Sequence, residues 1–525
     1  MNPSTSPIHH KNVFAKFRNR DFRPYQQEAV EFAFESDKPI VCIEAPTGAG
    51  KSLIGMVTGQ MSGNMFYLCH TRHLQQQIID DFPEADKLWG RSNYACLQNP
   101  LGTAAECMHS KATPCEFRFS YCPYETAKQK VLGNSLGILN YDYFLFECNY
   151  VGRMSGRDVI ICDESDTLER ILSGFISLQL PFKLIKSLGI EEPKYVTPTE
   201  KNGLACWKEW AEEVGVAVIQ RGPSIISEVG RRYKDPQKKV AAENKMKKRL
   251  DGLMGKLEMF EKHVDGTWIF DRERMGGYLF RPTWVSEELA YQYFFRHGLK
   301  FVLMSATMEP MPSLAKLNGL NVGDIDYMYV PSNFDPKRRP VIFKPCANMT
   351  KKTHDEEIDK LVAGIRQVMD KHPNEKGLIH TTSYRVANDI MDRIHSDRLI
   401  THDAQNRIAQ VEMFMESSQP LVLVSPSTER GVSLEEDKCR FIIWAKAPFL
   451  NLGDKLTSNR LYGGGKIGEL WYRSNMIQTV IQGVGRGMRS AEDRCVTYIL
   501  DKQIIKAMGS SASDIPAWFK EAITI

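Results

Sequence analysis

The segment EAPTGAGKSLIG constrains the fold of this 525-residue chain more than any other feature. It follows the apolar run PIVCI and precedes a stretch of helical character, which is the strand, glycine-rich loop and helix order of a phosphate-binding loop. Lys51 is placed to reach the β and γ oxygens of a nucleotide and Ser52 to bind Mg²⁺, although Ala45 stands where the simplest pattern has glycine. The expected loop residues are Thr47, Gly48, Ala49, Gly50, Lys51 and Ser52.

Six further apolar runs are similar to PIVCI in length and composition: NMFYLCHT, DVIICDE, KFVLMSAT, KGLIHTT, PLVLVSP and RFIIWAKAP. They are bounded by turn or polar residues, as buried parallel strands are. Because helical stretches alternate with these runs, we expect an α/β fold. At about 150 residues per domain, the length predicts roughly three to four domains.

The composition indicates a folded protein that works inside the cell. Apolar residues make up 42% and charged residues 25% of the chain, close to globular averages. The longest uninterrupted apolar runs have five residues, far short of the ~20 that span a membrane. The N-terminus carries scattered charge and lacks the apolar core of a signal peptide, so we expect neither a membrane span nor secretion.

Positive charge is concentrated in one segment. The whole chain has a net charge of +4, yet residues 231–249 contain nine Lys or Arg against Asp235 and Glu243, a local charge of +7. On this segment alone we favour a solvated helical face. Contact with a polyanion is the alternative.

Strand signals fade between Leu168 and Val264, where apolar residues occur at helical spacing. They return near Trp268, so we expect a mainly helical insertion within one α/β domain. A second set of strands begins after PSNFDPKRRP, which contains several turn residues. The expected boundaries are 1–95, 123–167 and 265–325 for the first α/β domain, 96–122 and 168–264 for its two insertions, and 326–525 for the second α/β domain.

An acidic pair follows the run DVIIC, at the carboxyl end of a strand, where α/β proteins bind ligands. Asp163 can hold the Mg²⁺ of a nucleotide while Glu164 polarises the water that attacks the γ-phosphate. Taken alone, such a pair is as often an exposed turn. Together with the phosphate loop, it predicts nucleotide hydrolysis.

A polar helical face is expected in the second α/β domain. In QTVIQGVGRGMRS, Gln482, Arg486 and Arg489 stand at i, i+4 and i+7, on one side of a helix. When a nucleotide lies between two domains, arginines from the far side neutralise charge in the transition state. Without the other motifs, an exposed basic helix would be the simpler interpretation.

Twelve cysteines in an intracellular chain suggest buried thiols or metal ligands sooner than disulfides. Cys42, Cys69 and Cys162 lie in apolar runs, as small core residues do. Four others fall within 27 residues and need a separate explanation: Cys96, Cys107, Cys115 and Cys122.

In chain order these segments resemble the motifs of superfamily 2 helicases, specifically the iron-sulfur branch that includes XPD and DinG. RPYQQEA is similar to the adenine-reading motif, with Gln26 as the expected base contact, and APTGAGKS to motif I. TRHLQQQ resembles motif Ia, DESD stands in the place of the DEAH box, and SAT resembles motif III. STERGVSL and QGVGRGMR resemble motifs V and VI. The resemblance runs from about Phe22 to Asp501 and implies two RecA-like motor domains.

The resemblance also gives the cysteine block a role. GRSNYAC, which supplies Cys96, matches the text that opens the cluster domain of this family, and YCPYETAK supplies Cys122. Four thiolates are the ligands that a [4Fe–4S] cluster requires. Intervals of ten, seven and six residues differ from the paired CxxC of many zinc sites. Zinc and free thiols are the alternatives, and we expect His109 nearby to be a surface loop residue.

The resemblance implies an ATP-dependent DNA helicase that translocates along a single strand, with 5′-to-3′ polarity. The helical insertion corresponds to the Arch domain, so residues 231–249 would line a DNA channel, and Thr71 and Ser433 would hold the DNA backbone. We expect a monomer that binds single-stranded, forked or R-loop DNA. The residues that would hold ATP, Mg²⁺ and the attacking water are Lys51, Ser52, Asp163, Glu164, Gln482, Arg486 and Arg489.

Three departures from the family pattern qualify these expectations. DESD lacks the histidine of DEAH, the helical insertion is short, and only about 20 residues precede the adenine motif, so the nuclease domain fused to some DinG relatives is expected to be absent. A translocase that strips proteins or RNA from DNA without processive unwinding would need the same motor residues. A nucleotide-binding scaffold is the non-enzyme alternative.

Overall fold

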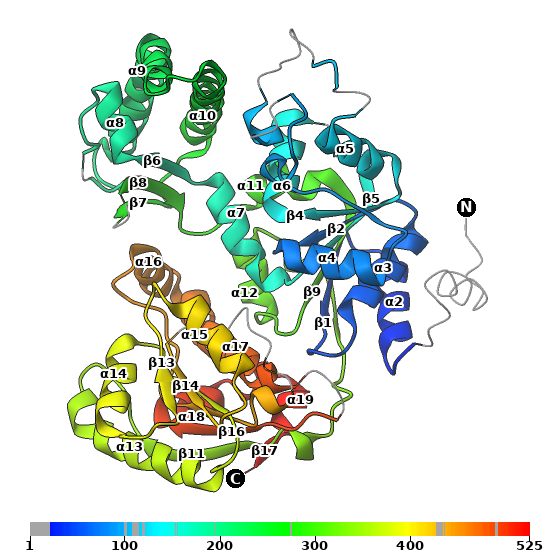
Figure 1. The fold of residues 1–525 in the computed structure, drawn as a ribbon, viewed down its shortest axis with the longest axis vertical. Coiled ribbons are helices and arrows are strands. Elements are labelled where there is room, and N and C mark those ends of the chain that lie inside the picture. The colour runs from blue at the N-terminus through cyan, green and yellow to red at the C-terminus, as the bar shows by residue number, and fades with distance from the viewer. Residues whose placement is uncertain are drawn as a thin grey trace.

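The computed structural model describes residues 22–98, 102–107, 115–117, 121–152, 154, 156–194, 196–273, 276–426, 434, 436–488 and 492–524. Two α/β domains lie one above the other in Figure 1, and a group of helices with a small sheet projects from the upper one. Within the described residues, no helix combines the length and the apolar character needed to cross a membrane.

A seven-stranded sheet of parallel strands forms the centre of the first domain. In order across the sheet the strands are β10 (Ile325–Tyr329), β1 (Ile40–Glu44), β9 (Gly298–Ser305), β5 (Arg157–Asp163), β2 (Met65–Cys69), β4 (Leu136–Asn140) and β3 (Asp86–Lys87). β1 and β2 are buried along their whole length, which explains their continuous apolar sequences. Four of the predicted strands are therefore confirmed here as β1, β2, β5 and β9.

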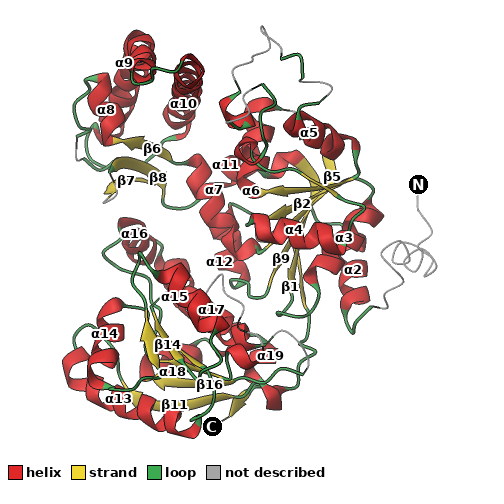
Figure 2. Ribbon diagram, viewed as in Figure 1, coloured by secondary structure: helices red, strands yellow, loops and turns green. Residues whose placement is uncertain are grey.

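Helices flank this sheet (Figure 2), and several begin at recognisable signals. Thr71 caps one of them by accepting a hydrogen bond from the Leu74 N–H at 3.3 Å, and another begins with Pro123 at its first position. The helices of this domain are α2 (Gln26–Glu35), α3 (Lys51–Ser62), α4 (Arg72–Asp81), α5 (Pro123–Gly133), α6 (Tyr141–Phe146), α7 (Leu168–Ile176), α11 (Glu287–Tyr293) and α12 (Met311–Asn318).

The second domain repeats this plan around another seven-stranded parallel sheet. Its strands, in order across the sheet, are β13 (Leu399–Thr401), β14 (Val422–Ser425), β12 (Gly377–His380), β15 (Phe441–Trp444), β16 (Val496–Asp501), β11 (Val341–Ala347) and β17 (Ile523–Thr524). Its helices are α13 (His354–Lys371), α14 (Tyr384–Arg393), α15 (Arg407–Glu416), α16 (Lys455–Gly463), α17 (Gly465–Val484), α18 (Lys502–Ser510) and α19 (Ala517–Lys520). The predicted α/β fold with two parallel sheets is therefore confirmed.

The insertion after α7 contains a sheet as well as helices. Its elements are β6 (Leu178–Pro181), α8 (Phe182–Leu188), α9 (Gly203–Arg231), α10 (Pro236–His263), β7 (Trp268–Glu273) and β8 (Gly277–Pro282). The three strands form a separate antiparallel sheet in the order β6–β8–β7. Its aromatic side chains pack on the long helices, with the Phe280 ring 5.2 Å from Trp207 and 5.1 Å from Phe260.

Two expected boundaries need correction. β7 and β8, which follow residue 264 and were expected to belong to the first α/β domain, pair only with each other and with β6 in the small sheet. The boundary expected at residue 325 cuts through β10, which pairs with β1 in the first sheet. A short apolar run indicates a strand, but which strand it pairs with depends on contacts between residues that are distant in the sequence.

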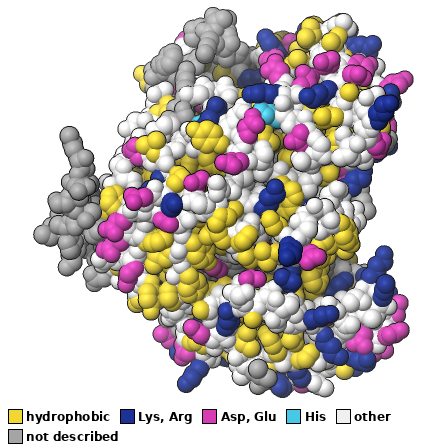
Figure 3. Space-filling model, turned by 180° about the vertical axis from the view of Figure 1, so that it is seen from behind, with side chains coloured by type: hydrophobic (Ala, Val, Ile, Leu, Met, Phe, Trp, Pro, Cys, Tyr) yellow, Lys and Arg dark blue, Asp and Glu magenta, His cyan; other side chains and the backbone are white. Residues whose placement is uncertain are grey.

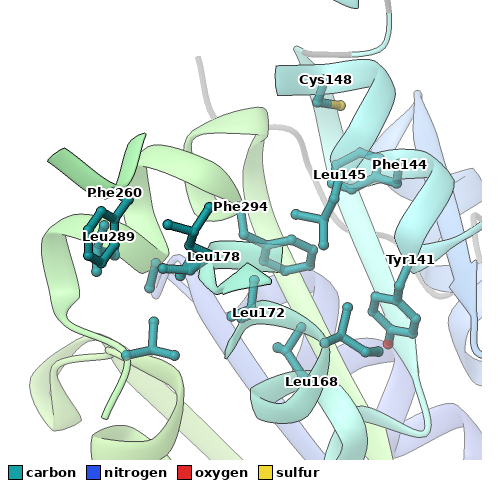
Figure 4. Packing of buried hydrophobic residues seen from close by; sticks show 14 of the residues in the cluster. Tyr141, Phe144, Leu145, Cys148, Leu168, Leu172, Leu178, Phe260, Leu289 and Phe294 are labelled. Atoms are coloured by element: carbon teal, nitrogen blue, oxygen red, sulfur yellow. The ribbon is translucent and has the colours of Figure 1, made fainter. Parts of the chain in front are cut away.

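One hydrophobic core continues from the first domain into the insertion. Tyr141 and Phe144 of α6, Leu172 of α7 and Phe260 of α10 belong to the same buried cluster. Figure 4 shows the Phe260 side chain beside Leu289 of α11, and Phe294 between these residues and α6. The base of the insertion is thus packed rigidly onto the first domain.

Candidate nucleotide site between the two α/β domains

Several strands of the first domain end in polar residues at the same edge of its parallel sheet. β1 ends at Glu44, β5 at Asp163 and β9 at Ser305. The Ala45 N–H donates to the Ser305 carbonyl oxygen at 2.8 Å, which fixes the start of the phosphate loop against β9. Ligands of parallel α/β sheets bind at this carboxyl edge.

The phosphate loop requires glycine at two positions. Gly48 and Gly50 have φ angles of +83° and +79°, in the left-handed region that favours glycine. A Cβ on Gly50 would lie 2.1 Å from Gln26 Nε2, and one on Gly48 would lie 2.2 Å from the Phe334 ring. The loop leads into the N-terminus of α3, where unpaired backbone N–H groups attract phosphate.

Gln26, the expected base contact, supports the phosphate loop in this structure. Its side chain is 1% exposed. Its Oε1 accepts from the Arg23 N–H and its Nε2 donates to the Ala49 carbonyl oxygen, both at 2.8 Å. Gln26 therefore lies beside the loop, and it would have to exchange the Ala49 bond to reach a base.

Lys51, Ser52 and Asp163 lie close together, since the Lys51 charge acts on Asp163 and Tyr67 hydrogen-bonds to both Asp163 and Ser52. Lys51 Nζ donates to the Ala45 carbonyl oxygen at 3.2 Å. Asp163 is buried; its Oδ2 accepts from Tyr67 Oη at 3.0 Å and its Oδ1 from the Glu164 N–H at 2.9 Å. Burial raises the pKa of Asp163, whereas the Lys51 charge and these bonds act in the opposite direction. A desolvated carboxylate is suited to holding a cation, and the lysine beside it is suited to holding a phosphate.

Glu164 has the strained backbone that is common at functional sites, with a φ of +50°. Burial raises its pKa, and the negative charges of Asp163 and Asp166 raise it further. The charges of Lys51 and of Arg486 from the second domain lower it. A half-buried carboxyl group whose pKa is raised is suited to accept a proton from water near neutral pH.

Asp166, the last residue of DESD, bonds to both domains. Its Oδ1 accepts from Ser305 Oγ at 2.9 Å, and its Oδ2 accepts from Gln482 Nε2 of α17 at 3.1 Å. The same Gln482 amide donates to Thr307 Oγ1 at 2.9 Å. In the sequence, Asp166 stood out only because it occupies the position of the DEAH histidine. In the structure it joins the acidic segment, the SAT segment and the second domain.

The turn after α17 lies against the phosphate loop. α17 ends at Val484, and Arg486 lies in the 3₁₀ turn η9 (Gly485–Gly487), so the predicted helical face is shorter than expected. A Cβ on Gly485 would lie only 3.6 Å from Thr47 Oγ1. Because Gly485 and its neighbour Gly483 are weak helix formers, the chain can approach the loop closely there. Arg489 lies outside the described residues.

A second contact joins the domains beside the site. Ser474 Oγ of α17 donates to Glu309 Oε2, which also accepts from Ser313 Oγ at 3.1 Å. Burial raises the pKa of Glu309 to about 7, and the serine bonds oppose that shift. Nearby, Glu44 and Gln478 line an interdomain cavity of about 10 Å³, room for roughly one water molecule.

A third contact joins the second domain to the root of the insertion. Arg460 of α16 forms an ion pair with Glu169 of α7, and its Nε donates to the Thr283 carbonyl oxygen at 2.7 Å. The guanidinium lies 5.0 Å from the Trp284 ring and 5.2 Å from the Trp471 ring. A buried arginine with a carboxylate and two indoles holds these elements together.

The cysteine segment lies beside α5 and α10. An isolated bridge pairs Ala95 with Thr103, and Cys122 precedes α5 as its N-cap. All twelve cysteines are free thiols, and the four of the block are half-buried: Cys96, Cys107, Cys115 and Cys122. Among the described residues, no group of three or more His, Cys, Asp or Glu side chains is arranged to hold a metal ion. Thiols are the donors that an iron-sulfur cluster uses. In this structure, however, the four described cysteine side chains are not grouped as ligands of one metal site.

The basic segment is exposed, as its sequence predicts. All nine of its Lys and Arg side chains are exposed. Lys248 of α10 nevertheless reaches the cysteine segment, where its Nζ donates to the carbonyl oxygens of Ala105 at 3.3 Å and Cys107 at 3.4 Å. Figure 3, which shows the molecule from behind the view of Figure 1, has Lys and Arg interspersed with Asp and Glu over the surface that it displays.

Of the two expected DNA contacts, one can be placed. Thr71 is exposed at the start of α4. Ser433 and most of the STERGVSL segment lie outside the described residues, as does His109.

Sequence reasoning missed the residues that join the two domains. No sequence motif includes Glu309, Ser474 or Arg460. Glu309 and Ser474 bond to each other and Arg460 bonds to Glu169, in each case across more than 100 residues. The signal available in the sequence was the position of Glu309, two residues after the SAT segment.

Comparisons with known proteins agree with this arrangement. A family model for the helicase C-terminal domain matches residues 365–522. The ATP-dependent DNA helicase YoaA of Escherichia coli K12 is 24% identical over 216 residues, which cover 39% of this chain and 33% of the relative. YoaA of Haemophilus influenzae is 20% identical over an alignment of 600 residues, covering 93% of this chain and 92% of the relative.

Solved structures extend the match to the whole fold. An XPD helicase superposes with a TM-score of 0.60 at 13% identity, covering 95% of this chain and 98% of that one. S. tokodaii Xpd4 superposes with a TM-score of 0.59 at 13% identity, covering 96% and 100%. The second α/β domain thus matches the helicase C-terminal domain family, and over nearly its whole length the chain is similar in sequence to YoaA helicases and in fold to XPD helicases.

Proposed function

We propose that this protein is a DNA helicase that uses ATP hydrolysis to move along single-stranded DNA from 5′ to 3′. The observation that carries the proposal is the bonding of Gln482 to Asp166 and Thr307 across the two domains. Because these bonds connect the acidic segment to the other domain, a change in the nucleotide can alter how the domains meet. The names of the YoaA relatives support DNA as the track, and the polarity rests on the family resemblance alone.

The residues of the site would have different roles in ATP hydrolysis. The phosphate loop and Lys51 would bind the phosphates, while Glu164 would take a proton from the attacking water. Arg486, with Arg489, would neutralise the charge that develops on the γ-phosphate. Ser52 and Asp163 would hold Mg²⁺, which stabilises that charge when bound.

The cysteine block would hold a [4Fe–4S] cluster through Cys96, Cys107, Cys115 and Cys122. Four free, half-buried thiols on one segment support this assignment. A cluster bound there supplies structural cross-links between the segment and α5. The bonds from Lys248 to the carbonyl oxygens of Ala105 and Cys107 would then hold the segment against α10.

The DNA substrate is proposed to be single-stranded, forked or R-loop DNA, bound by a monomer. The exposed lysines and arginines of residues 231–249 support contact with backbone phosphates, which is independent of sequence and weakens with salt.

The test is ATP hydrolysis with and without single-stranded DNA, together with strand displacement from duplexes that carry a 5′ or a 3′ overhang. We expect DNA-stimulated hydrolysis and displacement from the 5′ overhang, both lost in Lys51→Ala. Hydrolysis that DNA does not stimulate would refute a DNA motor. Stimulated hydrolysis without displacement would instead indicate a translocase that clears proteins or RNA from DNA.

A further inference from the structure

A buried glutamine at the contact between the two α/β domains carries a donor that is not used. Gln478 of α17 is 8% exposed, and among the described residues its Nε2 has no hydrogen-bond partner. One turn further along α17, the Gln482 amide donates to both Asp166 and Thr307. Because buried polar groups of native proteins are paired with protein or with ordered water, the Gln478 amide needs a partner of its own.

Glu44 faces the same contact from the first domain. It is the last residue of β1, directly before the phosphate loop, and it is 6% exposed. Tyr327 Oη of β10 donates to its Oε2, and the Met308 backbone N–H also donates to its carboxyl group. Burial raises the pKa of Glu44 to about 7, and these two bonds oppose that shift. Since a carboxyl group offers about four acceptor positions, Glu44 can accept further bonds.

A small cavity lies between Glu44 and Gln478. Its volume is about 10 Å³, and Thr307, Ser474 and Asp514 supply the other polar groups of its wall. The rest of the wall is made of Met, Ile and Pro side chains. That volume holds about one water molecule, and a buried water typically makes about three hydrogen bonds. The cavity therefore suits one water molecule in both size and polar partners, whereas a larger ligand does not fit.

Glu44 also stands where nucleotide binding reaches the sheet. The next residue, Ala45, donates its N–H to the Ser305 carbonyl oxygen at 2.8 Å, and its own carbonyl oxygen accepts from Lys51 Nζ at 3.2 Å. The Glu44 carbonyl oxygen accepts from the Val330 N–H at 2.8 Å. A bound phosphate would draw Lys51 away from Ala45. The backbone beside Glu44 would then respond to the nucleotide before the rest of β1 does.

We propose that one water molecule in this cavity bridges Glu44 and Gln478, and that these two residues are positioning residues that align α17 with the phosphate loop. The bridge runs beside the direct bonds of Gln482, on about the same face of α17. Nucleotide binding, which recruits Lys51, is thereby transmitted from β1 to α17, where hydrolysis needs Gln482 in place. This inference rests on the proposed function and adds two residues that lie outside the site assigned to it.

The first experiment compares kcat and KM for ATP hydrolysis by the full-length protein with single-stranded DNA present. Gln478→Met keeps the length of the side chain but removes its donor. Loss of one hydrogen bond that matters only during hydrolysis should lower kcat and kcat/KM together by about 2- to 10-fold, with KM close to that of the wild type. Gln367→Met, the same change at an exposed position of α13, is the matched control and should match the wild type.

A double variant tests whether Glu44 and Gln478 act together. Glu44→Met removes the acceptor, so Glu44→Met with Gln478→Met should be no slower than the slower of the two single variants, because either change breaks the same bridge. Effects that multiply would show that the two residues act independently. Tm is measured for every variant, since a purely structural role of Gln478 would lower Tm while leaving kcat of the folded protein unchanged.

A crystal structure of the wild type at a resolution that shows ordered water tests the bridge directly, even if Glu44→Met does not fold. We expect density for one water within hydrogen-bond distance of the Glu44 carboxyl group and of Gln478 Nε2, and no such water in Gln478→Met. A direct bond between the two side chains, or a dry cavity, would overturn the inference.

The outcomes separate this inference from the function on which it rests. If the wild type hydrolyses ATP in response to single-stranded DNA and Gln478→Met is as fast as Gln367→Met, the bridge plays no part in hydrolysis while the DNA motor stands. If the wild type does not hydrolyse ATP, the proposed function itself fails, and the positioning role fails with it, whatever the cavity contains.

Discussion

At the scale of single residues, three carboxylates of one short segment face three different partners. Asp163 is buried and bonded to Tyr67. Glu164 stands on a left-handed backbone, where its pKa is raised chiefly by burial. Asp166 bonds to Ser305 and to the second domain. Within four residues, the acidic segment therefore makes a contact between the domains and supplies the two residues proposed to bind a cation and to accept a proton.

Replacement of Glu164 by Gln is predicted to abolish hydrolysis while leaving ATP bound. Glutamine keeps the shape of the side chain but cannot accept the proton of the attacking water, so kcat should fall by roughly 10²- to 10⁴-fold. The measurement is kcat for ATP together with the Kd of a fluorescent ATP analogue. Glu412→Gln, an exposed change on α15, is the control. Loss of nucleotide binding in Glu164→Gln would contradict the assigned role.

Asp166 and Gln482 are predicted to act as one unit. Asp166→Ala leaves the Gln482 amide without its charged partner, and a hydrogen bond to a charged group is worth about 1.5–3 kcal/mol. A double-mutant cycle of Asp166→Ala and Gln482→Ala on kcat/KM for DNA-stimulated ATP hydrolysis should therefore show a coupling of roughly 0.5–3 kcal/mol. Additive effects of the two changes would show that the bond plays no part in the reaction.

At the scale of elements, α17 carries several of the residues through which the second domain contacts the first. Ser474, Gln478 and Gln482 are spaced four residues apart, so they lie on about the same face. Ser474 donates to Glu309, Gln478 lines the small cavity with Glu44, and Gln482 bonds to Asp166. Movement of this one helix would break all of these contacts together.

The contact between α17 and Glu309 is predicted to weaken as pH rises. Burial raises the pKa of Glu309 to about 7, and the negative charges of Glu169 and Asp166 add to this, while the Ser474 and Ser313 hydroxyls oppose it. Stability from a raised carboxyl pKa is fully present below the ordinary value and is lost as pH rises through about 7. Because Glu309 is partly exposed, the loss should be no more than about 1–2 kcal/mol.

Thermal unfolding from pH 5 to 8.5 tests this prediction. The side chain at position 309 stays neutral at every pH in Glu309→Gln. The Tm of this variant should therefore increase relative to the Tm of the wild type as pH rises through 7. Glu412→Gln should follow the wild type, because the Glu412 side chain is exposed. A constant difference in Tm between Glu309→Gln and the wild type at all pH values would disprove the titration.

The sequence predicts elements better than it predicts their partners. Strands of both parallel sheets could be found because full burial gives continuous apolar runs, and the phosphate loop because its glycines and Lys51 have fixed spacing. β7 and β8 were assigned to the wrong sheet, since a strand's own residues do not specify its neighbour. The role of Asp166 could not be predicted, because Gln482 is 316 residues away and meets it only after both domains fold.

At the scale of the whole molecule, the insertion touches both domains. Its base shares the core of the first domain (Figure 4). Its small sheet also contacts the second domain, where Arg281 pairs with Asp454 at 3.0 Å and Lys455 Nζ donates to the Phe270 carbonyl oxygen at 3.2 Å. Changes in the distance between the domains would therefore reach the insertion, which carries the basic helix.

Replacement of Cys115 by Ser is predicted to remove iron and strand displacement while leaving part of the ATP hydrolysis. The nucleotide residues come from the edges of the two sheets and α17, so loss of one thiolate ligand should leave their site assembled. Iron content after anaerobic purification, absorbance at ~400 nm and both activities are the measurements. Cys206→Ser, a free thiol of α9 outside the block, is the control. An unchanged rate of displacement in Cys115→Ser would refute a cluster that unwinding needs.

The packing around Arg460 gives this protein an optical reporter of its own. Trp284 lies at the root of the insertion and Trp471 on α17, their rings are 6.0 Å apart, and the Arg460 guanidinium lies near both. Indole emission depends on nearby charge and water, so separation of the two domains would change the intensity and colour of this pair. The steps of an ATP cycle could then be followed in real time by intrinsic fluorescence, with Trp471→Phe as the blank and no attached dye.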